Sequence, residues 1–208
     1  MNRIVIFSIL GLILLSSIVS GQSNSIDMVS MYLDSLKKSF PELNSIQLSN
    51  ARLIILKFQK IGDEDLRKLA YILATAYHES KFYPIKEQRA KPGTDVYNLQ
   101  SKYWDSGFYG RGFVQLTLIA NYEKFSRILG VDLVKNPDLA LNDNVAAFII
   151  NYGMLNGSFT GRKLSDYINF FTVDYFGARK VVNGTDRAEL IASYAEKINQ
   201  NVNPKVAS

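Results

Sequence analysis

Apolar residues recur at spacings of three and four along most of this chain, and this spacing constrains its fold more than any other feature. Alternation of apolar and polar residues, as in a strand, is scarce. A period near 3.6 residues is typical of amphipathic helices. We therefore predict a mainly α-helical domain, with helices over residues 26–40, 46–61, 63–80, 118–129, 144–155 and 186–202.

Several of these predicted helices carry their own end signals. Gly62 is expected to end one helix, Asp63 to cap the next, and Gly130 to end the helix that starts near residue 118. Residues 81–112 interrupt the pattern with prolines, glycines and many aromatic side chains. A long irregular segment inside a compact domain is usually functional or disordered, and the aromatic residues favour a packed segment here.

The N-terminal residues have the order of a secretory signal peptide. One basic residue, Arg3, precedes an apolar run over residues 4–19, and small residues follow that run. We expect cleavage of residues 1–21, which leaves one exported domain over residues 22–208, extracellular or periplasmic, monomeric and without stable membrane association. The alternative is a retained anchor, because the run approaches the roughly 18 apolar residues that a spanning helix needs.

The composition excludes several classes of site and partner. The chain has no cysteine and a single histidine, His78. Thiol catalysis is therefore excluded, and the ligands of a transition-metal site are missing, so we expect no metal. The net charge of +5 is scattered along the chain rather than gathered in a basic stripe, which argues against a nucleic-acid partner.

Two glutamates are placed as acid–base chemistry requires. Glu79 lies in the last turn of the predicted helix 63–80, where the helix dipole and partial burial both favour the protonated form that a general acid needs. Glu87 follows eight residues later, in the irregular segment, where a loop can hold its carboxylate across a cleft. Asp95 and Asp105 are alternatives for the base. Paired carboxyl groups of this kind are what cleavage of a glycosidic bond requires.

The segment over residues 109–122 has the side chains of a sugar-binding site. Its short polar groups can hydrogen-bond sugar hydroxyls or a water molecule, and its aromatic rings can stack on sugars. The polar residues are Gln115, Thr117 and Asn121, and the aromatic ones are Tyr109, Phe113 and Tyr122. A glycine turn that leads into a helix would have the same pattern, so the segment alone leaves both interpretations open.

Six stretches of the chain, in collinear order, resemble the catalytic domain of glycoside hydrolase family 19, which contains chitinases and phage endolysins. They fall between about residues 69 and 197 and read AYHES, PIKEQRA, SGFYGRGFVQLTLIANY, LGVDLVKNPDLAL, GMLNGSFTGRKLSDYI and ARKVVNGTDRAELIASYAE. The resemblance implies a mainly α, two-lobed, lysozyme-like domain with a central substrate cleft. It also implies hydrolysis by inversion, without a cofactor.

The resemblance also implies a role for individual residues. Glu79 matches the general acid, Glu87 the general base, and Thr117 the hydroxyl residue that helps to hold the attacking water. Sugar-contacting positions are matched by Gln115, Asn121, Tyr122 and Asn183, with Arg187 as a candidate for a buried arginine contact. Plant members of the family have disulfides and longer loops, and this chain has neither, so we expect a shorter cleft.

We therefore expect a secreted, endo-acting hydrolase of β-1,4 linkages in N-acetylglucosamine polymers, with chitin slightly ahead of peptidoglycan as its polysaccharide partner. One alternative is a lysozyme-like enzyme that cleaves peptidoglycan, and retention of residues 1–21 would make it a membrane-tethered lytic enzyme. Another is a catalytically weak carbohydrate-binding protein on the same scaffold. Such a protein would have lost one of the two carboxylates, and both Glu79 and Glu87 are present.

Overall fold

The computed structural model describes residues 28–202 of the 208-residue chain, and the predicted signal peptide lies outside them. The described part is mainly helical, as predicted. Its helices span residues 28–39, Ser45–Ile61 (α2), Leu66–Ser80 (α3), Asp95–Gln100 (α4), Ile119–Leu129 (α5), Asp143–Asn156 (α6) and Ala188–Val202 (α7). Four short 3-10 helices span Trp104–Ser106 (η1), Pro137–Leu141 (η2), Leu164–Asp166 (η3) and Gly177–Val181 (η4). Among these described helices, none is long and apolar enough to cross a membrane.

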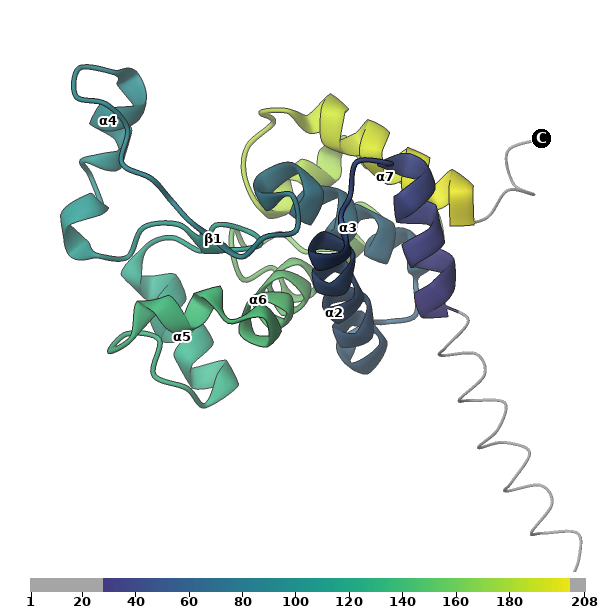
Figure 1. The fold of residues 1–208 in the computed structure, drawn as a ribbon, viewed down its shortest axis with the longest axis horizontal. Helices are drawn as coiled ribbons and strands as arrows, with labels where there is room; N and C mark the ends of the chain where they lie inside the picture. The colour runs from purple at the N-terminus through teal and green to yellow at the C-terminus, as the bar shows by residue number, and fades with distance from the viewer. Residues whose placement is uncertain (1–27, 203–208) are drawn as a thin grey trace, which may run out of the picture.

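The helices form two sides of one molecule (Figure 1). Helices α2, α3, α7 and the helix at residues 28–39 lie on one side, and the β-hairpin and α5 lie on the other, with α6 between them. Helix α3 packs along α7, and α2 packs along α6. One cluster of buried apolar side chains runs from Val29 to Val202 and joins both sides. This arrangement agrees with the mainly α, two-lobed domain that the family resemblance implies.

Helix α3 is enclosed on nearly all sides. Eleven of its 15 residues are buried, including a continuous stretch from residue 68 to residue 77. Small residues at Ala70, Ala74 and Ala76 allow neighbouring helices to approach its axis closely. The position and direction of α3 are therefore fixed by the core, and so is the place where the helix ends.

The start of α3 differs from the prediction that Asp63 caps it. Asp65 is the N-cap, and its carboxylate accepts a hydrogen bond from the backbone N–H of Arg67 at 3.2 Å. Glu64 has a left-handed backbone (φ 67°), so the chain turns once more before the helix begins. Asp63 instead forms an ion pair with the buried Lys68. Apolar spacing could not distinguish two aspartates so close together.

The end of α3 is held by side chains of α2. Lys81 and Phe82 both have left-handed backbones (φ 50° and 61°), which are uncommon for residues other than glycine. Their carbonyl oxygens accept hydrogen bonds from the amides of Gln47 and Asn50, each at 2.9 Å. These bonds satisfy the backbone groups of the turn that follows Glu79. Elsewhere, Gly62 and Gly130 end their helices as predicted.

Residues 81–112 contain more regular structure than the sequence indicates. Strands β1 (Ile85–Lys86) and β2 (Arg111–Gly112) pair antiparallel, with Ile85 opposite Gly112. Residues 88–109, here called the arm, extend from this hairpin, and Figure 1 shows them projecting away from the rest of the molecule. The arm carries α4, whose six residues are too few to produce a detectable apolar period.

Candidate active site

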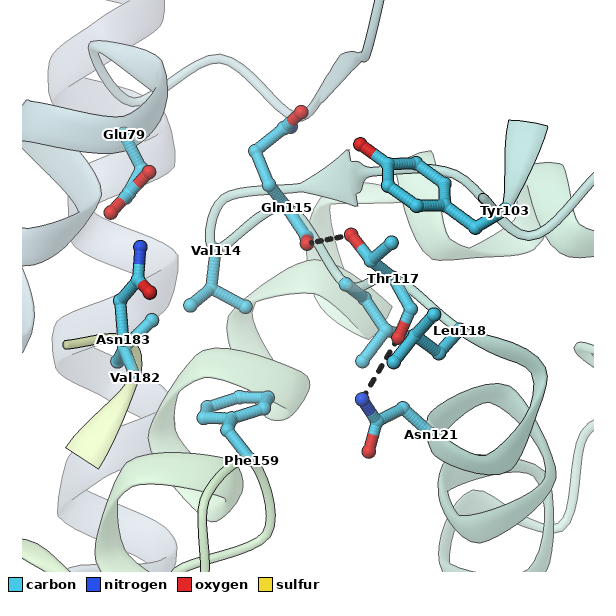
Figure 2. Close-up of a pocket in the computed structure, with 11 residues that line it drawn as sticks. Glu79, Tyr103, Val114, Gln115, Thr117, Leu118, Asn121, Phe159, Val182 and Asn183 are labelled. Carbon is cyan, nitrogen blue, oxygen red and sulfur yellow. Dashed lines mark hydrogen bonds between the residues drawn. The ribbon is translucent and has the colours of Figure 1, made fainter. Parts of the chain in front are cut away.

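A cavity of about 460 Å³ opens beside the C-terminal end of α3 (Figure 2). Its walls come from the end of α3, the arm and the segment after β2. A segment that precedes η3 and a segment that follows η4 complete them. The structure brings five of the predicted site residues to this cavity: Glu79, Gln115, Thr117, Asn121 and Asn183. These residues come from parts of the chain more than 100 positions apart.

Glu79 lies in the cavity wall with its carboxylate paired to a buried arginine. The Nη1 atom of Arg179 donates to Oε1 of Glu79 at 2.6 Å, and the side chains are 4% and 19% exposed, respectively. Arg179 belongs to η4, and its Nε also donates to the carbonyl of Asp186 at 3.0 Å. The guanidinium therefore joins the end of α3 to η4 and fixes the position of the Glu79 carboxylate in the cavity wall.

Arg179 is the main residue of the site that sequence reasoning missed. It lies in the ARKVVNG stretch, but no spacing indicates that it faces a helix 100 positions earlier in the chain. The family resemblance offers Arg187 as a candidate for a buried arginine contact, and the structure places this residue elsewhere. Its side chain is exposed and lines a separate hollow beside Phe176. The buried arginine is therefore Arg179.

Asn183 follows η4 and lies next to Glu79 in the cavity wall. Its backbone N–H donates to the carbonyl of Arg179 at 3.0 Å, so the arginine and the asparagine are held by the same turn. Figure 2 shows its side-chain amide turned toward the carboxylate of Glu79. The amide can therefore reach a ligand that contacts Glu79.

Glu87 accepts three hydrogen bonds. The backbone N–H of Gly110 donates to Oε2 at 2.8 Å, while Gln100 Nε2 and the hydroxyl of Tyr103 donate to Oε1 at 2.9 and 2.8 Å. Three donors hold both oxygens of the Glu87 carboxylate in a fixed position, as a general base requires. Glu87 does not itself line the cavity, but Tyr103 does, so the hydroxyl of Tyr103 connects Glu87 to the cavity.

Tyr103 remains a donor to Glu87 at neutral pH. Burial, and then the hydrogen bond to Glu87, raise the pKa of Tyr103 to about 12. Its phenol is therefore protonated throughout the range in which a carboxylate base would act. Gln100 is buried, and its amide also bonds the backbone at Gln88 and Ala90, which fixes the orientation of its donor group.

The alternative bases are not brought to the cavity. Asp95 lies in the first turn of α4 and Asp105 lies in η1, and both are exposed. Neither lines the cavity beside Glu79. Within residues 28–202, no three His, Cys, Asp or Glu side chains gather as metal ligands would.

The segment after β2 is held by its own polar groups. The hydroxyl of Thr117 donates to the carbonyl of Gln115 at 2.8 Å, and the amide of Asn121 donates to the carbonyl of Thr117 at 2.8 Å (Figure 2). Gln115 has a left-handed backbone (φ 54°), and its Nε2 donates to the carbonyls of Ile85 and Gly112. These bonds hold the loop in shape, and they leave side-chain oxygen atoms as acceptors for a ligand.

Tyr109 and Tyr122, two residues predicted to contact sugar, lie outside the cavity wall. Tyr122 is fully buried, and its hydroxyl donates to the carbonyl of Tyr109 at 2.8 Å while it accepts from Arg111 at 3.1 Å. Tyr109 is stacked on Trp104, with ring centroids 4.3 Å apart, and the guanidinium of Arg111 lies 4.2 Å from its centroid. The ring of Tyr109 is therefore engaged by Trp104 and Arg111 within the protein.

Phe113, the third aromatic residue proposed for stacking, is also fully buried. Tyr109 and Tyr122 do not line the cavity. Both tyrosines surround Arg111, which is 4% exposed and pairs with Asp138 at 2.7 Å. Through Arg111 and Asp138, their contacts connect the base of the arm to η2, outside the cavity.

Comparison with known proteins places this geometry in context. Residues 55–159, about half of the chain, match the family model described as "Chitinase class I". An acidic 27 kDa endochitinase of Solanum lycopersicum is 33% identical over 93 residues, which are 44% of this chain and 38% of that protein. A basic endochitinase B of Arabidopsis thaliana is 46% identical over 66 residues, which are 30% of this chain and 19% of that protein. The matched part thus spans well under half the length of these relatives.

The fold also resembles a solved structure. Chitinase C from Streptomyces griseus HUT6037 superposes with a TM-score of 0.51 at 20% sequence identity. The alignment covers 81% of this chain and 75% of that chain. At this identity the likeness concerns the fold alone.

The pair of Arg179 and Glu79 yields a prediction about stability. Replacement Arg179→Met leaves the carboxylate of Glu79 partly buried without its partner, and we expect the free energy of unfolding to fall by about 3 kcal/mol. Replacement Arg187→Met, at an exposed position, should change it by less than about 0.5 kcal/mol. Urea denaturation of both variants measures these changes, and equal effects would contradict the assignment of Arg179 as the buried partner.

Proposed function

The chain belongs to the class I chitinase family, and on this premise we propose that it is a glycoside hydrolase that cleaves β-1,4 linkages of N-acetylglucosamine polymers. One observation carries the proposal: Glu79 lies in the wall of a cavity to which Glu87 is connected through Tyr103. Chitin is the favoured polymer because the relatives with matching sequences are named endochitinases. Peptidoglycan contains the same sugar and is the alternative.

In the proposed mechanism Glu79 is the general acid and Glu87 is the general base. Glu79 gives its proton to the oxygen of the scissile linkage as the bond to the anomeric carbon breaks. Glu87 takes a proton from a water molecule whose oxygen attacks that carbon from the opposite face, so the configuration inverts. Figure 2 supports this division, because Glu79 and Tyr103, the donor to Glu87, lie on opposite sides of the cavity.

The contact with Arg179 holds the carboxylate of Glu79 at the cavity wall, where a bound glycan can reach it. The amide of Asn183 and the hydroxyl of Thr117 both line the cavity and are placed to contact the glycan or the attacking water. The acid and the base are side chains of the chain itself, so the proposed reaction needs no cofactor.

We further propose that the enzyme acts outside the cytoplasm. The support is the order of the first 21 residues, in which a basic start precedes an apolar run and small residues. The proposed partner is therefore an extracytoplasmic polysaccharide, and the proposed acting form is a monomer.

Product analysis tests this function. The protein is incubated separately with N-acetylglucosamine oligomers and with purified peptidoglycan, and the products are identified by mass. We expect shortened oligomers, and a reduction of about 10²–10⁴-fold for Glu79→Gln and for Glu87→Gln, because each removes a proton-transfer group. Asp95→Asn and Asp105→Asn are matched controls that should retain activity.

Other outcomes would redirect the proposal. Release of muropeptides without cleavage of the oligomers would make the protein a lysozyme-like enzyme. If Asp95→Asn or Asp105→Asn lost more activity than Glu87→Gln, the base would be wrongly assigned. A folded protein that acts on neither polymer would be the carbohydrate-binding protein considered above.

The contact between Tyr103 and Glu87 gives a second prediction. Replacement Tyr103→Phe removes one donor to an ionised carboxylate, a bond worth about 1.5–3 kcal/mol, so we expect kcat on oligomers to fall roughly 10- to 100-fold. Tyr97→Phe, on the same arm, is the control, because the structure shows no bond from Tyr97 to Glu87. Similar kcat values for the two variants would show that the phenol does not position the base.

A further inference from the structure

Two phenylalanines on one turn are almost fully exposed. Phe170 is 89% exposed and Phe171 is 91% exposed, more than any other large apolar side chain in the described part of the chain. They lie at the tip of residues 168–173, here called the phenylalanine turn. Their ring centroids are 5.3 Å apart and the ring planes are nearly perpendicular, at 87°.

Hydrogen bonds within the turn hold its backbone, although its tip is exposed. Ile168 and Val173 form an antiparallel bridge, and the backbone N–H of Asn169 donates to the carbonyl of Thr172 at 2.9 Å. The side chain of Asn169 accepts from Phe171 N at 2.9 Å and donates to the carbonyl of Ser165 at 3.0 Å. The backbone therefore holds the two rings out in solvent, where exposed apolar area is unfavourable unless a partner covers it.

The phenylalanine turn lies at the end of α3 opposite to the cavity. Arg67, at the start of α3, donates from Nη2 to the carbonyl of Asn169 at 3.0 Å. Glu79 lies at the other end of this 15-residue helix, about 20 Å away at 1.5 Å per residue. The turn is therefore not part of the cavity. Perpendicular rings also cannot lie together on one flat sugar surface, which argues against a polysaccharide as the occupant.

The helix at residues 28–39 contacts the same end of α3. The hydroxyl of Tyr32, in the first helix, donates to the carbonyl of Leu66 at 2.6 Å, and the hydroxyl of Tyr175 donates to the carbonyl of Arg67 at 3.4 Å. The apolar run over residues 4–19 ends nine residues before residue 28. Nine extended residues reach at most about 30 Å, so any membrane that holds this run lies within that distance of residue 28.

The charges at this end are largely paired within the protein. Arg67 pairs with Asp65 at 2.8 Å, and Lys68 pairs with Asp63. The two cations at the start of α3 are thus paired, while Arg162, which donates from Nη1 to the hydroxyl of Tyr167 at 2.9 Å, is exposed near the turn. We expect a contact at this place to depend mainly on burial of the two rings.

We propose that Phe170 and Phe171 enter the interfacial layer of the lipid bilayer in which the N-terminal apolar run is inserted before cleavage. The domain then rests on the membrane with its cavity facing away. Two exposed rings form a weak, reversible anchor, and stable membrane attachment requires a second signal, here the apolar run. Cleavage of the run therefore releases the domain, which reconciles a membrane contact with the export proposed above. This inference does not depend on the hydrolase activity.

Fluorescence quenching tests the contact. The full chain is reconstituted into phosphatidylcholine vesicles with bromine on the acyl chains, in a Trp104→Phe background that removes the native fluorophore. Phe171→Trp reports on the phenylalanine turn, and Val96→Trp, at a position of α4 that is 56% exposed, is the matched control. We expect bromine to quench the emission of Phe171→Trp and to leave that of Val96→Trp unchanged. Both positions are exposed, so both variants should fold, which circular dichroism checks.

Three results would overturn the proposal. The first is quenching of Phe171→Trp that does not exceed that of Val96→Trp. The second is quenching that appears only when anionic phosphatidylglycerol is added, because the contact would then depend on charge. The third is protection of the Phe171→Trp fluorophore from aqueous acrylamide by insoluble chitin and not by vesicles, which would assign the phenylalanine turn to the polysaccharide.

Discussion

The burial of α3 is the constraint on which the rest of the structure depends. A helix that is covered over most of its circumference cannot rotate or shift without opening the core. Its two ends are therefore fixed points: one carries Glu79 and the other contacts the phenylalanine turn. The paired carboxylate of Glu79 and the buried Arg179 join the end of α3 to η4, so that a distant part of the chain completes the cavity wall.

The two proposed catalytic carboxylates are positioned by different means. Glu79 takes its place from a core helix, whereas Glu87 takes its place from hydrogen bonds with Gln100, Tyr103 and Gly110. Two of these three donors belong to the projecting arm. The geometry of the base is therefore coupled to the arm, and a movement of the arm would change the base while it left the acid in place.

The helices could be predicted from the sequence because each buries an apolar stripe with a regular period. The period did not distinguish Asp65 from Asp63 as a cap, and it could not detect α4, which is shorter than two turns. Glu79, Gln115, Thr117, Asn121 and Asn183 reach the cavity, but Tyr109 and Tyr122 turn inward around Arg111, because aromatic residues in a glycine-rich segment can pack either way. Arg179 and Glu79 are 100 positions apart in the sequence, so their contact depends on the tertiary fold and no local sequence pattern predicts it.

The stereochemistry of the first product tests the central claim most directly. If Glu79 and Glu87 act as acid and base on opposite faces of the sugar, water attacks from the face opposite to the leaving group. Proton NMR of an N-acetylglucosamine hexamer, recorded during the first minutes of cleavage by the full chain, reports the anomeric configuration before mutarotation. The account predicts the α-anomer from a β-linkage. Initial formation of the β-anomer would contradict it, because the configuration would then be retained.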